Sequence, residues 1–99
     1  MRESGIQRNI LKALNALPQT KAINLHGSAY MEAGTPDLLC VSKGRVYFLE
    51  VKRPGYKATS IQQHVQRAWR DAGARVAVVT SASEALQVVS QSYPDSNEG

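Results

Sequence analysis

The sequence contains one cysteine, Cys40, and two histidines among its 99 residues. A lone cysteine cannot form an internal disulfide, and so few soft ligands do not supply a cluster with zinc-ligand spacing. No stretch approaches the ~20 apolar residues that a membrane-spanning helix needs, and the N-terminus lacks the continuous apolar core of a secretory signal. These absences argue against a disulfide scaffold, a soft-metal site and a membrane protein, so a cytosolic protein is expected.

The chain is basic, with 12 Lys and Arg residues against 8 Asp and Glu, a net charge of +4 and a pI near 9.5. Asp95 and Glu98 lie in a polar tail, so leaving that tail out raises the net charge from +4 to +6. The length and the apolar content of 42% suit a single core, so we expect one domain over residues 1–93 and a tail over 94–99. Excess Lys and Arg favours a polyanionic partner such as DNA.

Apolar spacing and turn residues divide the chain into seven expected elements. Apolar residues three and four positions apart precede Pro18 and predict a helix, whereas short β-branched runs bounded by turn residues predict strands. The expected order is a helix over residues 4–17, strands over 21–26, 37–42 and 45–52, a helix of about a dozen residues after Thr59, a strand over 75–80, and a helix from Ser81 to about Ser90. The strand-helix-strand unit from 45 to 80 should be a right-handed parallel crossover. The fold class is therefore α/β, with a mixed sheet flanked by helices.

Local signals also predict how individual residues are placed. Glu84 follows Ser81 by three positions, which predicts a reciprocal capping box at the start of the last helix. Trp69 lies on the apolar stripe of its helix and is expected in the core. In the first strand, Ile23 and Leu25 should share one face.

The second and third strands bring two acidic residues together. A turn centred between Lys43 and Gly44 makes these strands antiparallel, and in that register Asp37 faces Glu50. Opposed side chains have Cβ atoms about 4.5 to 5.5 Å apart, and like charges at that distance are destabilising. Lys52 shares the face of Glu50, because side chains two positions apart in a strand point the same way. Two acids and a lysine at the end of a buried strand need a shared ligand or reaction.

A divalent cation would relieve the repulsion between the two carboxylates. Mg²⁺ takes hard oxygen ligands from one or two carboxylates while it keeps several waters and binds substrate phosphate. Such a metal can generate hydroxide and polarise a phosphoryl oxygen, and Lys52 can orient the attacking water or stabilise charge on the phosphate. The pattern favours cleavage of a phosphodiester backbone with Mg²⁺ or Mn²⁺.

The sequence Gly34-Thr35-Pro36-Asp37 followed by Glu50-Val51-Lys52 resembles the PD-(D/E)xK nuclease superfamily, and the layout resembles its virus-type replication-repair nuclease (VRR-NUC) branch. The resemblance spans residues 3 to about 89, although the segment from Gly27 to Ala33 matches no motif. It implies a restriction-endonuclease-like αβββαβα core. It also implies Asp37, Glu50, Lys52 and Gln62 as catalytic residues, and Glu3, Asp37, Glu50 and Val51 as residues that hold the metal.

Small members of this family resemble dimeric Holliday junction resolvases. The resemblance therefore implies a homodimer that cleaves branched or junction DNA, in a bacterial or phage-encoded cytoplasmic protein. Arg53 and Lys57 are the residues expected to contact DNA, because they lie in the loop that leaves the strand of Glu50.

Several residues of the predicted site also have a purely structural interpretation. Glu50 and Lys52 can form an ordinary strand-end ion pair. Glu3 can act as a first-turn acid that interacts favourably with the helix dipole. Gln62 has the spacing of a capping box with Thr59. His26 has no partner in sequence, and no role is assigned to it.

Three functions remain open at this point. The first is a junction-cleaving endonuclease, and the second is a flap or restriction-like nuclease that uses the same site on another DNA structure. The third is a basic nucleic-acid-binding module without catalysis. Metal-dependent cleavage separates the first two from the third, and a panel of duplex, flap and four-way junction substrates separates the first from the second.

Overall fold

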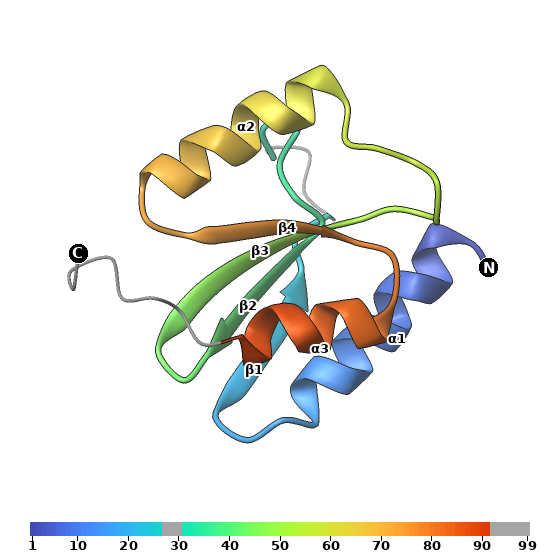
Figure 1. The fold of residues 1–99 in the computed structure, drawn as a ribbon, viewed down its shortest axis with the longest axis vertical. Coiled ribbons are helices and arrows are strands. Elements are labelled where there is room, and N and C mark those ends of the chain that lie inside the picture. The colour runs from blue at the N-terminus through green and yellow to red at the C-terminus, as the bar shows by residue number, and fades with distance from the viewer. Residues whose placement is uncertain (27–30, 92–99) are drawn as a thin grey trace.

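The computed structural model of the chain describes residues 1–26 and 31–91, which form three helices and four strands. The element order matches the expected one (Figure 1). The elements are α1 (Glu3–Asn15), β1 (Thr20–Asn24), β2 (Leu38–Ser42), β3 (Arg45–Val51), α2 (Ser60–Asp71), β4 (Arg75–Val79) and α3 (Ala82–Ser90).

The four strands form one mixed sheet in the order β1-β2-β3-β4. β1 to β3 are antiparallel neighbours, whereas β3 and β4 are parallel and are connected through α2. Figure 1 shows α2 on one face of this sheet and α1 with α3 on the other. The expected α/β fold with a mixed sheet is confirmed. In the described residues, no helix has the length and apolar character that crossing a membrane requires.

The core lies between the sheet and the pair α1 and α3. Alternate residues of β2 and β3 point to that face because side chains in a strand alternate between its two sides. α1 contributes apolar residues at spacings of four, which form one stripe of the helix. The most deeply buried members of this core are Ile10, Leu14, Leu38, Cys40, Tyr47, Leu49, Val51, Val79 and Ala85.

The β2–β3 hairpin fixes the register that positions the acidic residues. Lys43 and Gly44 have φ values of 51° and 81°. Positive φ at both central residues is the geometry of a two-residue type I′ turn, which glycine adopts without steric cost. The ladder runs from Ser42 paired with Arg45 to Leu38 paired with Leu49. The next position outward is Asp37 opposite Glu50, as the sequence predicted.

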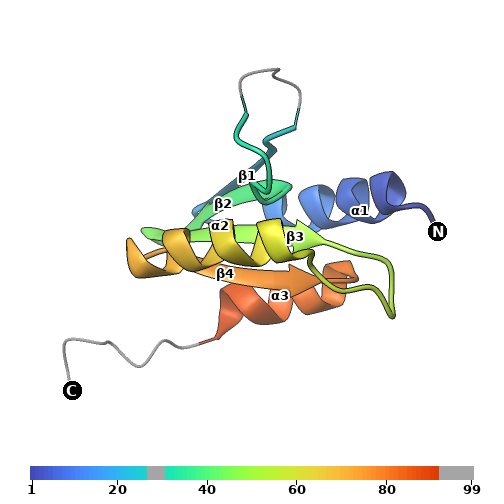
Figure 2. The same cartoon turned by 90° about the horizontal axis from the view of Figure 1, so that it is seen from above.

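The other face of the sheet is only partly covered. α2 contacts β4, and in Figure 2 β1 and β2 extend beyond it. Trp69 of α2 stacks on Phe48 with ring centroids 4.4 Å apart, but the tryptophan remains 39% exposed. The prediction that Trp69 lies in the core is therefore wrong, because an apolar stripe shows which side of a helix faces the sheet and not how far the sheet extends beneath it.

Two smaller expectations also differ from the structure. β1 ends at Asn24, before Leu25, and Ile23 lies on the partly covered face with 44% of its surface exposed. At the start of α3, the Ser81 hydroxyl accepts the backbone N–H of Glu84 as expected. The carboxylate of Glu84 accepts the backbone N–H and the hydroxyl of Thr80, so the box is not closed on Ser81.

Gly34 lets the connection between β1 and β2 pass close to α2. Its φ is +87°, and a Cβ at this position would lie 2.8 Å from Cγ2 and 2.9 Å from the carbonyl oxygen of Ile61. A larger residue would be strained by both the backbone conformation and the contact with backbone atoms. Glycine at this position therefore lets the chain turn against α2 before it reaches Asp37 and enters β2 at Leu38.

Candidate active site

Asp37 and Glu50 lie at the end of the sheet where β3 finishes and β2 begins. Asp37 immediately precedes β2 and is 8% exposed, whereas Glu50 is the penultimate residue of β3 and is 2% exposed. Burying two neighbouring carboxyl groups costs free energy unless partners compensate them. The hydrogen-bond and ion-pair partners of the two carboxyl groups therefore decide how their burial is compensated.

Both oxygens of Asp37 have a partner. Oδ2 accepts a hydrogen bond of 2.7 Å from the backbone N–H of Val51. Oδ1 lies 2.7 Å from Nε2 of His26, whose side chain is 46% exposed. His26 reaches this position because the chain after β1 stays beside Asp37, where the Leu25 N–H donates to the Asp37 carbonyl at 2.8 Å. Sequence reasoning assigned His26 no role, and no spacing in the sequence indicated this contact.

Glu50 has partners on one oxygen only. Its Oε2 accepts a hydrogen bond of 3.1 Å from Nε2 of Gln62 and lies 3.5 Å from Nζ of Lys52. Among the described residues, no group donates a hydrogen bond to Oε1, although this atom is buried. The pKa of Glu50 is raised from 4.5 to about 7, chiefly by burial. The charge and side-chain hydrogen bonding of Asp37 raise this pKa further, and Lys52 lowers it.

Gln62 has two roles that the sequence presented as alternatives. Its Oε1 accepts a hydrogen bond from the backbone N–H of Thr59, and the backbone N–H of Gln62 donates to the Thr59 hydroxyl. The two bonds form a reciprocal capping box. The amide nitrogen at the other end of the same side chain donates to Glu50. The cap thus fixes one end of the amide and directs the other end toward the carboxyl group.

The comparisons with known proteins bear on the fold of the chain. No family profile matches the sequence, and neither does any curated protein. A similar solved structure is a VRR_NUC domain, which superimposes with a TM-score of 0.76 at 28% sequence identity and covers 92% of this chain and 97% of that chain. The chain is therefore similar to a VRR_NUC domain in both fold and sequence over most of its length. The resemblance found in the sequence is confirmed, and so is the expected fold.

The other residues predicted for the site differ in how they are placed. Val51 is fully buried, and its backbone N–H binds Asp37. Arg53 and Lys57 are exposed in the connection between β3 and α2. The guanidinium carbon of Arg53 lies 4.6 Å from the ring centroid of Tyr56, so this arginine is partly ordered by a cation–π contact.

Glu3 is the first residue of α1 and is partly exposed. Within residues 1–26 and 31–91, no group of three or more His, Cys, Asp or Glu side chains lies close enough to hold a metal. The structure therefore places Asp37 and Glu50 together but does not add Glu3 as a third acidic ligand. The role of Glu3 stays a prediction. The segment from Gly27 to Ala33, which matched no motif, lies partly outside the described residues.

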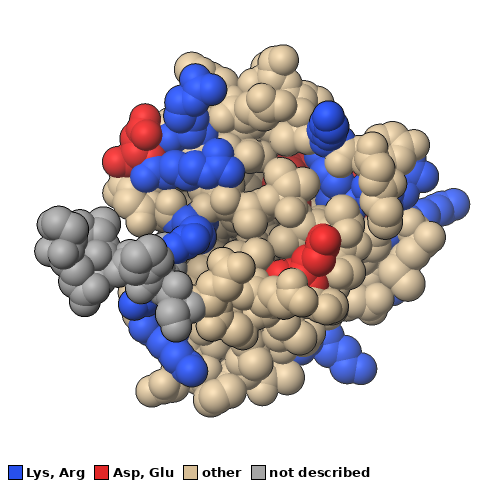
Figure 3. Space-filling model, viewed as in Figure 1, with Lys and Arg blue, Asp and Glu red and all other residues tan. Residues whose placement is uncertain are grey.

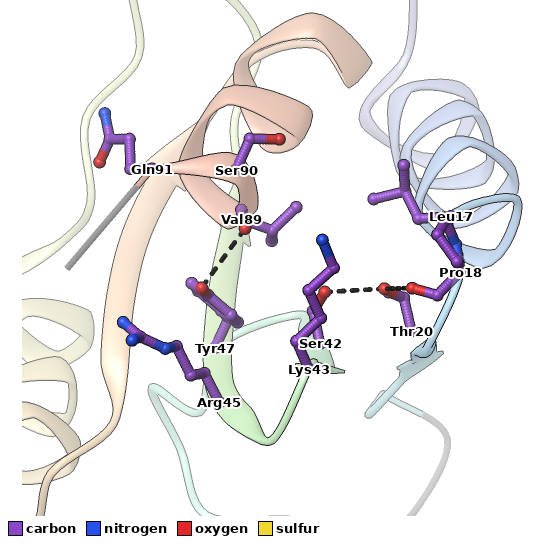
Figure 4. Close-up of a pocket in the computed structure, with 10 residues that line it drawn as sticks. All are labelled: Leu17, Pro18, Thr20, Ser42, Lys43, Arg45, Tyr47, Val89, Ser90 and Gln91. Carbon is purple, nitrogen blue, oxygen red and sulfur yellow. Dashed lines mark hydrogen bonds between the residues drawn. The ribbon is translucent and has the colours of Figure 1, made fainter.

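A hollow of about 290 Å³ lies at the opposite end of the sheet, between the β2–β3 turn and the C-terminal ends of α1 and α3 (Figure 4). Three of its polar side chains are paired within the lining. The hydroxyls of Thr20 and Ser42 lie 2.7 Å apart, and the Tyr47 hydroxyl donates to the Val89 carbonyl at 3.4 Å. Among the residues that the structure describes, its lining contains no Asp, Glu or His. The hollow therefore lacks the acidic side chains that the Asp37–Glu50 cluster brings together.

The raised pKa of Glu50 predicts how the metal-free protein responds to pH. Its pKa is about 7 in the folded state and ordinarily 4.5, so the folded state holds the proton more tightly. The stability that this proton contributes is fully present below about pH 4.5 and is lost as pH rises through 7. Glu50→Gln should remove the loss and raise the free energy of unfolding at pH 8 by on the order of 2 to 3 kcal/mol. Urea unfolding in EDTA at pH 5.5 and pH 8 measures it.

Glu84→Gln is the matched control. Hydrogen bonds from Thr80 lower the pKa of Glu84, so this exposed carboxylate is ionised throughout the same pH range. Its replacement should therefore shift both unfolding curves alike. If the free energy of unfolding changes equally between pH 5.5 and pH 8 in the wild-type protein and in Glu50→Gln, Glu50 is not held protonated by its surroundings.

Proposed function

We propose that this domain is a divalent-metal-dependent endonuclease that hydrolyses phosphodiester bonds in DNA. The likeness to a VRR_NUC domain supports a nuclease domain with DNA as its partner. The observation that carries the finer proposal is the pair of buried carboxyl groups, Asp37 and Glu50, with Lys52 beside them. An isolated ion pair between Glu50 and Lys52 would account for one acid, but it would leave the charge of Asp37 beside Glu50, where it raises the pKa of the Glu50 carboxyl group.

The residues present fit a hard cation such as Mg²⁺ or Mn²⁺. Oε1 of Glu50 is buried and receives no hydrogen bond from the described residues, and the charge of Asp37 raises the pKa of the same carboxyl group. A cation would give Oε1 of Glu50 a partner and would offset the repulsion between the two carboxylates. Asp37 and Glu50 would hold it through carboxylate oxygens. Val51 would do so through its backbone carbonyl, because its side chain offers no ligand. The bound cation would supply Lewis-acid polarisation of the phosphate.

Lys52 and Gln62 have separate tasks in this proposal. The side chain of Lys52 is 14% exposed, so its ammonium group reaches the site without being a freely solvated surface charge. In that position it can orient the attacking water or stabilise negative charge on the phosphate in the transition state. Gln62 donates to Glu50 from a capped helix start and holds the carboxyl group in one orientation.

Basic residues near the site suit binding to the DNA backbone. Arg53 and Lys57 are exposed in the β3–α2 connection, which begins directly after Lys52. Figure 3 shows Lys and Arg side chains at several separate places on this face, including the side where that connection lies in Figure 1. Phosphate contacts from such residues would make binding depend steeply on salt concentration. We assign Arg53 and Lys57 to DNA contact.

The proposed substrate is branched DNA, cleaved by a symmetric homodimer in the manner of a Holliday junction resolvase. Each chain carries one Asp37–Glu50 cluster, and paired cuts on opposing strands of a four-way junction need two. Two-fold symmetry is the commonest arrangement of soluble homo-oligomers. This part of the proposal rests on the family resemblance more than on the contacts of any residue.

Cleavage assays test the proposal in two steps. Duplex, flap and four-way junction substrates are incubated with Mg²⁺, Mn²⁺ or EDTA, and sedimentation is measured with and without the junction. We expect cleavage only with metal, and paired junction cuts by a dimer. Single nicks on flaps by a monomer would favour a flap or restriction-like nuclease. DNA binding without cleavage under any metal condition would instead favour a non-catalytic binding module.

A further inference from the structure

The chain just after β1 contacts Asp37 at two points. The backbone N–H of Leu25 donates to the Asp37 carbonyl at 2.8 Å, and the ring nitrogen Nε2 of His26 lies 2.7 Å from Asp37 Oδ1. The second carboxylate oxygen accepts the backbone N–H of Val51 at 2.7 Å. One oxygen is thus contacted from the chain after β1 and the other from β3, and the two contacts together fix the plane of the carboxylate.

His26 is itself held in place from α1. Its backbone N–H donates to Oδ1 of Asn24 at 2.7 Å, and the amide nitrogen of Asn24 donates to Oε1 of Gln7 at 2.9 Å. A continuous series of hydrogen bonds therefore runs from Gln7 through Asn24 and His26 to Asp37. We call Gln7, Asn24 and His26 the Asp37 brace.

The exposure of the brace argues against a role in folding stability. The side chain of His26 is 46% exposed, and the hydrogen bonds between Gln7, Asn24 and His26 are at the surface. Surface hydrogen bonds exchange with water and contribute little net free energy to folding. Orientation of Asp37 is a better account, because carboxylates that bind metals are commonly held by hydrogen bonds from outside the ligand set.

We propose that His26 is a positioning residue that orients the Asp37 carboxylate toward the divalent cation, and that Asn24 and Gln7 hold His26 in that position. This inference rests on the proposed metal-dependent function. The carboxylate keeps a lone pair on each oxygen beyond those used by His26 and Val51, so the brace leaves room for a metal. The ordering of Asp37 takes place before the cation arrives, which raises the affinity for the cation.

Calorimetry with Mn²⁺ tests the brace without any measurement of cleavage. His26→Ala should weaken Mn²⁺ binding about tenfold, which is the low end of the effect of residues that support metal ligands. His26→Gln keeps a side-chain N–H donor and should recover most of the affinity. His64→Ala removes an exposed histidine of α2 and should leave the affinity unchanged. Urea unfolding in EDTA should give nearly equal midpoints for all four proteins.

Asn24→Ala extends the test to a residue that does not touch Asp37. It should weaken Mn²⁺ binding by less than His26→Ala, and the double variant should bind no more weakly than His26→Ala alone, since both act through one series of contacts. Additive losses would contradict this route.

The possible failures of the test can be told apart. Unchanged or tighter Mn²⁺ binding by His26→Ala would overturn the inference alone, and tighter binding would mean that the imidazole competes with the cation for Asp37. A wild-type protein that binds no Mn²⁺, or binds it equally well as Asp37→Asn, would overturn the proposed function and the inference together.

Discussion

Replacing Asp37 with asparagine should abolish DNA cleavage while the fold is retained. Asparagine has the same shape and keeps an oxygen that can accept the N–H of Val51, so the local structure can persist. It removes the negative charge that a hard cation needs. Because a bound metal stabilises transition-state charge by several kcal/mol, its loss should lower the single-turnover rate by about a thousandfold or more. Relief of the repulsion with Glu50 should leave the metal-free protein at least as stable.

Two measurements and one control variant decide this prediction. Single-turnover cleavage gives the rate of the chemical step, and calorimetry gives the affinity for Mn²⁺. Asp71→Asn makes the same chemical change at an exposed position near the end of α2 and should alter neither quantity. An Asp37→Asn protein with wild-type Mn²⁺ affinity would show that Asp37 does not hold the metal, even if cleavage were lost.

The local parts of the site could be predicted because short-range rules determine them. The type I′ turn at Lys43 and Gly44 sets the hairpin register, and the register places Asp37 opposite Glu50. The capping box of Gln62 was likewise readable from its distance to Thr59. What the sequence could not show was that these two features meet. The contact between Gln62 and Glu50 depends on where the crossover places α2, which no local spacing determines.

The contact between His26 and Asp37 could not be predicted for a related reason. The connection between β1 and β2 has no apolar period, so nothing in the sequence indicates which of its residues returns to the sheet. The same limitation explains the wrong prediction for Trp69. Its stripe correctly faces the sheet at Phe48, but the extent of sheet beneath the helix is a tertiary property. Long-range placement, and not residue chemistry, is what the sequence left undetermined.

Replacing Lys52 with alanine should slow cleavage far more than it weakens DNA binding. The ammonium group lies 3.5 Å from Glu50 and the Lys52 side chain is 14% exposed, so this group faces Glu50 more than the solvent. Removing one group that stabilises transition-state charge typically lowers the rate 10²- to 10³-fold, about 3 to 4 kcal/mol. Ground-state affinity should change much less, because the interaction is strongest in the transition state. Single-turnover rates and DNA titrations at equal salt measure the two effects.

Lys57→Ala is the matched control for Lys52→Ala, because it removes the same charge from an exposed position in the β3–α2 connection. Loss of a phosphate contact there should weaken binding and reduce the slope of log affinity against log salt concentration by about one, while the chemical step changes little. Lys52 lowers the pKa of Glu50, so Lys52→Ala should shift the pH dependence of cleavage to higher pH. Rates are therefore compared across pH 6 to 9 at about unit intervals. If affinity falls in Lys52→Ala as much as the rate does, Lys52 is a phosphate anchor, and the group that stabilises the transition state must be sought elsewhere.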